Sequence, residues 1–201
     1  AGFPYVPDTE HGLTSFGIQC VEEMERMGMI IDVSHLSDAG FDDVLRYTKK
    51  PFVASHSNAR AICPWVRNLT DDMIRKLAER GGVTGLNFCG DFLRDPFAGK
   101  TSAKERKAAL QEKDTTGYQT MAGSEATFAD VVRHARHIIN VGGIECIGLG
   151  SDFDGIPDYP GRPKADRMDD LAEAFCDAGF TPDEIEHIFY RNVLRVYHDT
   201  L

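Results

Sequence analysis

Short apolar segments alternate with amphipathic segments of helical spacing along this chain, and this alternation constrains the fold more than any other feature. The apolar segments cover residues 29–33, 51–54, 82–88 and 144–150, and each gives way to polar residues. They lack the strict polar-apolar alternation of half-exposed strands, which is typical of strands buried on both faces of a parallel sheet. No hairpin turn joins them, so the order predicts an α/β fold with right-handed crossovers.

Capping residues mark where the intervening helices begin. Ser37, Thr70 and Thr127 have side chains preferred at N-caps, and Thr181-Pro182 combines an N-cap with proline at the first helical position. Four strands are half of the eight that a closed (β/α)₈ barrel requires, so the chain is either a small open sheet or half of such a barrel. The expected helices cover about 16–27, 37–49, 70–81, 127–141, 167–178, 181–189 and 190–199.

A polar stretch interrupts the third strand-to-helix connection. It belongs to an expected insertion at 90–126, whose middle, 102–113, has a helical pattern. Long insertions at strand ends are often functional, so this one forms either a lid over the strand ends or a surface loop. Apart from this insertion, we expect residues 1–201 to form a single domain.

The composition argues against several classes of partner. The net charge is −10, and an acidic surface repels the phosphates of nucleic acids. No apolar run reaches the roughly 18 residues that span a bilayer, and the first residues lack the features of a signal peptide. Five cysteines without a CxxC pair indicate reduced thiols, or else one disulfide and a free thiol. Together these features favour a cytoplasmic location.

Polar residues end three of the predicted strands: His35, His56 and Asp152. The carboxyl ends of parallel strands meet at one edge of a sheet, where α/β proteins build their sites. Imidazole and carboxylate suit Zn²⁺, so these residues form either a metal site or a set of hydrogen-bonded structural residues. Ser55 and Ser57 flank His56, but no GxSxG sequence accompanies them, which makes them weak candidates for a nucleophile.

Other polar residues leave alternatives open. His134 and His137 are three positions apart on one predicted helix, and they either occupy a half-buried helix face or pair on a metal. Arg60 and Arg67 follow the strand that ends at His56. An arginine on the site side can bind a substrate carboxylate through two hydrogen bonds, whereas either residue alone could equally be a surface group.

Several linked segments give a more specific indication. These segments cover residues 12–17, 28–35, 54–60, 67–71, 148–155 and 192–196. In sequence and order they resemble segments of the renal or membrane dipeptidase family, and the resemblance extends from about Gly12 to the C-terminus, most loosely over 90–125. The resemblance implies a (β/α)₈ barrel of the amidohydrolase type with two zinc ions. The chain would then be the C-terminal half of that barrel, with four parallel strands, and the N-terminal half would be absent.

The resemblance also implies roles for particular residues. His35 and His56 correspond to ligands of the second zinc ion. Arg67 corresponds to the residue that holds the terminal carboxylate of the substrate. Asp152 corresponds to the aspartate that handles the proton of the bridging water. The family's His-x-Asp pair, its bridging glutamate and a further histidine lie upstream of the matching part, so we expect the missing N-terminal half to be a partner of this chain.

The function implied is that of a zinc metallodipeptidase, which hydrolyses dipeptides with a free C-terminal carboxylate by attack of a metal-bridging hydroxide. Two alternatives remain at this point. One is a different amidohydrolase that acts on a cyclic amide. The other is an inactive fragment, either a binding module or a subunit of a split barrel, because the chain alone supplies only two of the zinc ligands. A homodimer is compatible with each of these.

Overall fold

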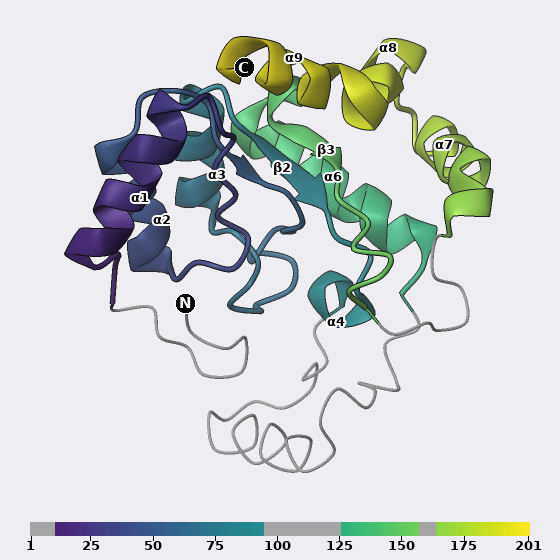
Figure 1. Cartoon of the computed structure of the whole chain (residues 1–201). Helices are drawn as coiled ribbons and strands as arrows, with labels where there is room; N and C mark the ends of the chain where they lie inside the picture. The colour runs from purple at the N-terminus through teal and green to yellow at the C-terminus, as the bar shows by residue number, and fades with distance from the viewer. Residues whose placement is uncertain (1–10, 95–125, 157–163) are drawn as a thin grey trace, which may run out of the picture.

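The computed structural model describes residues 11–94, 126–156 and 164–201. Its helices and strands follow the predicted alternation (Figure 1). The predicted helix at 102–113 lies outside the described residues, as does most of the expected insertion at 90–126. The elements are α1 (Ser15–Arg26), α2 (Asp38–Tyr47), β1 (Val53–Ala54), α3 (Asp71–Glu79), β2 (Val83–Leu86), α4 (Gly90–Leu93), α6 (Phe128–Gly142), η1 (Ile144–Cys146), β3 (Ile147–Leu149), η2 (Ala165–Arg167), α7 (Met168–Asp177), α8 (Pro182–Glu186), η3 (His187–Arg191) and α9 (Asn192–Thr200).

The described strands form a parallel sheet of three, in the order β1-β2-β3. Val53 pairs with Val83 and Ala54 with Thr84, whereas Leu86 pairs with Leu149, so β2 and β3 end at the same level of the sheet. The helices that connect them lie between consecutive strands in the chain, as right-handed crossovers require. The predicted α/β class with a parallel sheet is therefore confirmed.

The predicted first strand at 29–33 is wrong as a strand, because it forms only a single parallel bridge between Asp32 and Val53. Two hydrogen bonds flank this bridge: Val33 N–H donates to the Val53 carbonyl, and Val53 N–H donates to the Ile31 carbonyl. The ladder ends there because the Asp32 carboxylate accepts the Ser34 N–H at 3.0 Å. A side chain that captures a nearby backbone donor competes with continued strand pairing.

The N-caps predicted at Ser37, Thr70 and Thr181 are confirmed. Ser37 accepts the N–H of Gly40, and Thr70 accepts the N–H of Met73. Thr181 begins α8 in a reciprocal capping box with Glu184. Each of these caps satisfies a backbone donor that a helix N-terminus would otherwise leave without a partner.

The last two predicted helices are joined by a π-helical turn, η3, and no break separates them at residue 190. The turn directs Asn192 inward, where its amide donates to the carbonyls of Ile144 and Ile147 at 2.6 and 2.7 Å. Its side-chain oxygen lies 2.8 Å from His187 Nδ1. The wider turn therefore lets a polar residue bind the backbone at the start of β3.

Helices cover the sheet and enclose a continuous apolar core. In Figure 1, α1 and α2 lie on one side of the strands and the C-terminal helices on the other. Helices α3 and α6 pack against each other, and the η3 turn packs on β3. Phe41, Phe52, Phe88 and Phe175 are almost completely buried, and Phe41 meets Phe52 edge to face with ring centroids 5.5 Å apart.

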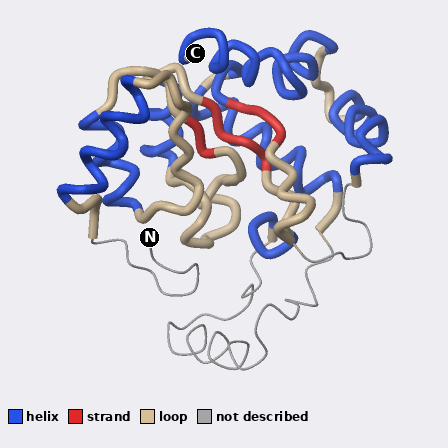
Figure 2. The backbone as a smooth tube through the Cα atoms, in the orientation of Figure 1, coloured by secondary structure: helices blue, strands red, loops and turns tan. Residues whose placement is uncertain are grey.

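The loop after β1 packs directly onto the ends of the other two strands. A Cβ atom on Gly85 would lie 2.0 Å from the Ser55 carbonyl oxygen, and one on Gly150 would lie 1.8 Å from it. Glycine is therefore required at both positions. As a result, the segment that carries Ser55 and His56 lies beside the carboxyl ends of β2 and β3, where the connecting loops gather (Figure 2).

Two expectations drawn from composition can be compared with this structure. All five cysteines are free thiols, in agreement with the interpretation that they are reduced. Among the described helices, none combines the length and the apolar character needed to cross a membrane.

Candidate metal and substrate site

Two imidazoles from consecutive segments face each other at the carboxyl edge of the sheet. His35 lies three residues after the bridge at Asp32, and His56 follows β1 by two residues. Their Nε2 atoms are 2.9 Å apart, and their ring centroids are 4.9 Å apart with planes at 57°. The strand ends thus bring together two of the residues that the sequence singled out.

The surroundings keep both imidazoles neutral. Partial burial lowers the pKa of His35, and the positive charge of Arg67 lowers it further. Burial likewise lowers the pKa of His56, against the opposing influence of Asp152. Neutral imidazole is the form that binds metal ions, so neither ring has to give up its positive charge before it can act as a ligand.

Asp32 holds the two loops together. Its Oδ1 accepts the N–H groups of Ser34 and Ser55, each at 3.0 Å, and the Ser34 hydroxyl at 2.7 Å. Its Oδ2 lies 2.5 Å from the Ser55 hydroxyl oxygen. Burial raises the pKa of Asp32, but the hydrogen bonds from Ser55 and Ser34 outweigh burial and leave this pKa below its usual value. The carboxylate is therefore ionised at neutral pH.

Ser55 is not arranged as a nucleophile. Its hydroxyl oxygen lies between the Asp32 carboxylate and His56 Nδ1, 2.7 Å from the latter. In a Ser-His-Asp triad the imidazole stands between the hydroxyl and the carboxylate, so that it can take the hydroxyl proton. Here the hydroxyl stands in the middle, and the carboxylate is its acceptor.

Arg67 is the arginine that reaches the imidazoles. It is buried, its Nε donates to the Ser34 carbonyl at 2.7 Å, and its Nη2 lies 3.1 Å from His56 Nε2. Its guanidinium carbon lies 5.6 Å from the centre of the Phe92 ring. A guanidinium held over an aromatic ring beside the two imidazole Nε2 atoms is well placed to bind an anionic group of a ligand.

Arg60 has a different role from Arg67. Its Nη1 and Nη2 donate to the two carboxylate oxygens of Asp38 at 2.7 and 2.8 Å. Its Nε donates to the Asn68 carbonyl, and Nη2 also donates to the Val66 carbonyl. Because these partners occupy most of its donors, Arg60 ties the loop that follows β1 to the start of α2.

Asp152 lies at the turn after β3 with φ at 60°, and it is the one non-glycine residue with positive φ in the described ranges. Its Oδ2 accepts a hydrogen bond from the Asn87 side-chain amide at 3.1 Å. The same amide donates to the His56 carbonyl at 3.2 Å. Asn87 thus links Asp152 to the segment that carries His56, and the unusual backbone conformation of Asp152 is typical of functional turns.

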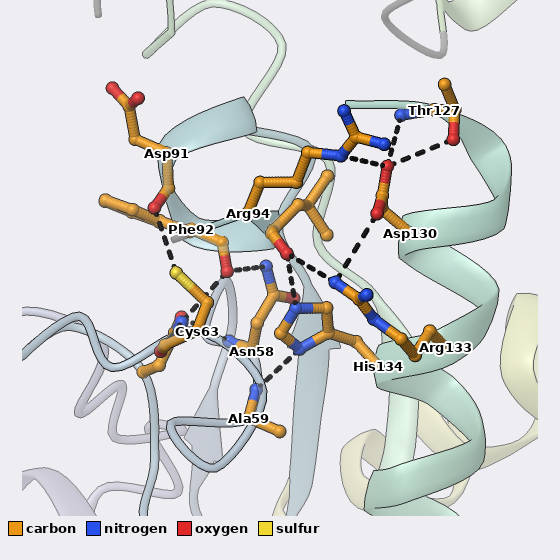
Figure 3. Close-up of polar contacts among 12 residues, drawn as sticks. Asn58, Ala59, Cys63, Asp91, Phe92, Arg94, Thr127, Asp130, Arg133 and His134 are labelled. Atoms are coloured by element: carbon orange, nitrogen blue, oxygen red, sulfur yellow. Dashed lines mark hydrogen bonds and ion pairs between the residues drawn. The ribbon is translucent and has the colours of Figure 1, made fainter. Parts of the chain in front are cut away.

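His134 supports the loops around the site. It is fully buried on α6, where its Nδ1 accepts the Ala59 N–H at 3.1 Å and its Nε2 donates to the Leu93 carbonyl at 3.0 Å (Figure 3). Burial lowers the pKa of His134 to about 4. His137 instead lies 2.7 Å from Asp71. The two histidines of α6 therefore have separate partners and do not pair on a metal.

Asparagines complete this support. Asn58 donates to the Phe92 carbonyl, as Figure 3 shows, and to the Asn87 carbonyl. Asn68 also donates to the Phe92 carbonyl. These buried amides fix the short helix α4 against the loop that carries Arg67, so they position the aromatic ring beside its guanidinium.

The donor atoms suit a metal ion such as Zn²⁺, but they are few. Two neutral imidazole nitrogens on one side of a site are typical zinc ligands. Within the described ranges, no group of three or more histidine, cysteine, aspartate and glutamate side chains is placed to hold a metal ion. Catalytic zinc usually has three protein ligands, so further ligands would have to come from residues beyond these two.

Sequence analysis missed two residues of this arrangement. Asp32 is a charged residue inside the apolar segment 29–33, and a charge in such a segment was the available signal. Asn87 stands near the end of the third apolar segment, just as His35, His56 and Asp152 stand near the ends of the other three. A search for any polar residue at a strand end would have found it.

A parallel α/β sheet with paired imidazoles at its carboxyl edge is the arrangement in which α/β proteins build their functional sites. A family model described as membrane dipeptidase, peptidase family M19, matches residues 4–200. The chain belongs to this family, and the resemblance in its sequence motifs is confirmed.

Individual relatives agree with this assignment. An uncharacterized dipeptidase of Schizosaccharomyces pombe, C965.12, is 36% identical over 193 residues, which are 95% of this chain and 40% of that protein. An uncharacterized Klebsiella pneumoniae protein from the pqqA 5′ region is 35% identical over 200 residues, covering 96% of this chain and 63% of that protein. This chain thus spans between two fifths and two thirds of these curated relatives.

A solved structure matches the fold over nearly the whole chain. It is the metallo peptidase from Rhodobacter sphaeroides, liganded with a phosphinate mimic of the dipeptide L-Ala-D-Ala. The two structures superpose with a TM-score of 0.80 at 34% identity, covering 99% of this chain and 50% of that one. The α/β unit described above therefore corresponds to about half of that metallopeptidase.

Proposed function

We propose that this chain forms the C-terminal half of a (β/α)₈ barrel in a zinc metallodipeptidase and supplies one side of its dinuclear metal site. The observation that carries the proposal is the pair of imidazole Nε2 atoms, 2.9 Å apart, with Arg67 within hydrogen-bond distance of one of them. Membership of the membrane dipeptidase family, which implies a metal, supports the same conclusion.

His35 and His56 would hold one zinc ion through their Nε2 atoms. Bound zinc would lower the pKa of a water molecule so that hydroxide is available near neutral pH. Asp152 would accept a proton from that water and pass it to the leaving amine. Asn87 holds Asp152 Oδ2 through its amide, which fixes the orientation of this carboxylate.

Arg67 binds the terminal carboxylate of the substrate. A metal held by His56 Nε2 would take the lone pair that Arg67 Nη2–H now contacts, which would leave this donor available for the carboxylate. Its Nε stays on the Ser34 carbonyl, which keeps the guanidinium in place. Substrates would therefore be dipeptides with a free C-terminus, in keeping with the dipeptide mimic on the Rhodobacter sphaeroides metallo peptidase.

The remaining metal ligands come from the N-terminal half of the barrel. The described residues offer two imidazoles at the site and no third ligand beside them. The matched structure is about twice as long as this chain, which leaves room for the other half. We therefore propose that residues 1–201 alone hydrolyse no dipeptide.

The test uses the full-length protein that contains this chain. Its zinc content is measured, and it is assayed on a panel of dipeptides, their C-terminal amides and cyclic amides. We expect two zinc ions per protein and hydrolysis of dipeptides with a free carboxylate only. Turnover of a cyclic amide with none of any dipeptide would replace the proposal by a different amidohydrolase activity. Hydrolysis of dipeptides by the metal-free protein would contradict it outright.

A further inference from the structure

Three groups form a chain of short contacts that the proposed mechanism does not use. The Ser55 hydroxyl oxygen lies 2.5 Å from Asp32 Oδ2 and 2.7 Å from His56 Nδ1. Asp32 belongs to the segment that leads to His35, whereas Ser55 and His56 follow β1. The contacts therefore join the two segments that carry the imidazoles, on the side of His56 that faces away from His35.

Counting protons fixes the direction of these hydrogen bonds. An ionised carboxylate only accepts, and a serine hydroxyl has one proton to give. The Ser55 proton therefore goes to Asp32 Oδ2, and the Ser55 oxygen can only accept from His56. It follows that His56 carries its proton on Nδ1 and a lone pair on Nε2.

The other end of the ring supports the same assignment. Arg67 Nη2, which only donates, lies 3.1 Å from His56 Nε2. A donor at this distance requires a lone pair on Nε2. His35 Nε2, at 2.9 Å, then donates to the same nitrogen in the protein without metal. Each contact of the His56 ring thus agrees with one tautomer, in which Nε2 is the ligand atom.

We propose that Asp32 is a positioning residue that acts through the Ser55 hydroxyl to hold His56 in the Nδ1–H tautomer, with Nε2 directed at the metal. The purpose of this tautomer, which is metal binding by Nε2, rests on the proposed function. The tautomer itself can be measured without any assay of hydrolysis. Metal-bound histidines commonly donate their second N–H to an oxygen acceptor that fixes the ring. Here a hydroxyl stands between the imidazole and the carboxylate.

Asp32→Asn is predicted to reverse the direction of the hydrogen bonds that run between residue 32, Ser55 and His56. Oδ1 of Asp32 accepts two backbone N–H groups, from Ser34 and Ser55, so the amide of an asparagine cannot occupy that position. The asparagine must keep its oxygen there and point its NH₂ at the Ser55 hydroxyl. Ser55 would then donate to His56 Nδ1, which forces the proton of His56 onto Nε2 and removes the ligand lone pair.

The experiment compares full-length proteins labelled with ¹⁵N at histidine. Long-range ¹H–¹⁵N spectra of the metal-free proteins report the tautomer of His56, and competition with a chelator reports zinc affinity. We expect Nδ1–H in the wild type and in Ser55→Thr, which keeps the hydroxyl. We expect Nε2–H in Asp32→Asn, a mixture in Ser55→Ala, and zinc affinity lower by about 10- to 100-fold in both.

Asp130→Asn is the matched control, because Asp130 is another hydrogen-bonded carboxylate that caps α6 away from His56. It should leave both the tautomer and the zinc affinity unchanged. An Nδ1–H tautomer with unchanged zinc affinity in Ser55→Ala and Asp32→Asn would overturn the inference, even if dipeptides are hydrolysed. If the His56 tautomer changes in the variants as expected but the protein hydrolyses no dipeptide, the proposed function would be wrong and the positioning role of Asp32 would stand.

Discussion

The Nε2 atoms of His35 and His56 face each other at 2.9 Å although the residues are 21 positions apart in the chain. The distance is that of a hydrogen bond, so one proton is shared by the two nitrogens. Parallel strand ends produce this pairing, because each segment delivers its polar residue to the same edge of the sheet. The pair is therefore the basis of the first prediction.

Replacement of either imidazole should remove one zinc ion from the full-length protein. His35→Ala and His56→Ala each leave one imidazole at this position, which is too few for a stable site. We expect the zinc content, measured by atomic emission, to fall from about two to about one per protein. His137→Ala is the control, since His137 contacts Asp71 and not the site, and it should keep the full zinc content. Unchanged zinc content in both site variants would show that these residues are not ligands.

Asp152→Asn should reduce kcat and leave zinc bound. Asparagine tolerates the positive φ of this position, so the turn should be preserved. Loss of a proton acceptor typically costs about 10²- to 10⁴-fold in rate. The measurement is kcat together with zinc content, with Asp154→Asn in the same turn as the control. Parallel loss of metal and activity in Asp152→Asn would assign this residue to metal binding.

Arg67→Lys should weaken recognition of the substrate carboxylate. Lysine keeps the charge but loses the planar pair of donors, and a hydrogen bond to a charged group is worth about 1.5–3 kcal/mol. We expect kcat/KM for dipeptides to fall by about 10- to 100-fold, with a smaller change for dipeptide amides.

Arg60→Lys provides a matched comparison for Arg67, because Arg60 contacts Asp38 and backbone carbonyls and does not reach His56. It should lower stability and leave the preference for a free carboxylate unchanged. If Arg60→Lys altered that preference and Arg67→Lys did not, the two roles would have to be exchanged.

Local signals along the chain predicted much of this fold. Ser37 and Thr70 mark helix starts because a capping side chain acts within its own turn. His35 and His56 were predicted to lie close together because parallel strands share a carboxyl edge. Such rules depend on a few neighbouring residues or on the common direction of parallel strands, so they can be applied to the sequence alone.

Contacts between distant residues were beyond such rules. The role of Asp32 depends on Ser55, 23 positions away, and the distinction between Arg60 and Arg67 depends on Asp38, 22 positions from Arg60. Strand 29–33 was predicted from apolar residues, but the Asp32 side chain ends the pairing after one bridge. Spacing in the sequence indicates which segments meet, whereas the partner of each polar atom is decided by packing.

His134 should make the protein less stable in acid. Burial lowers its pKa in the folded protein to about 4 from an ordinary value of 6.5, so the unfolded chain takes up the proton first as the pH falls. The stabilisation from neutral His134 is complete above pH 6.5, declines between 6.5 and about 4, and is lost below that. Because one pKa unit equals about 1.4 kcal/mol, the effect amounts to about 3 kcal/mol.

Urea unfolding of the wild type and of His134→Asn at several pH values between 7.5 and 4 would measure this effect. Asparagine retains an acceptor for the Ala59 N–H but does not titrate, so the variant should be less stable at pH 7.5 and lose less stability in acid. The midpoints of the two proteins should therefore converge as the pH falls. If the stabilities of the two proteins changed with pH in parallel, His134 would be protonated in the folded protein as readily as in the unfolded chain. That result would contradict the structure, in which both ring nitrogens of His134 are occupied by Ala59 and Leu93.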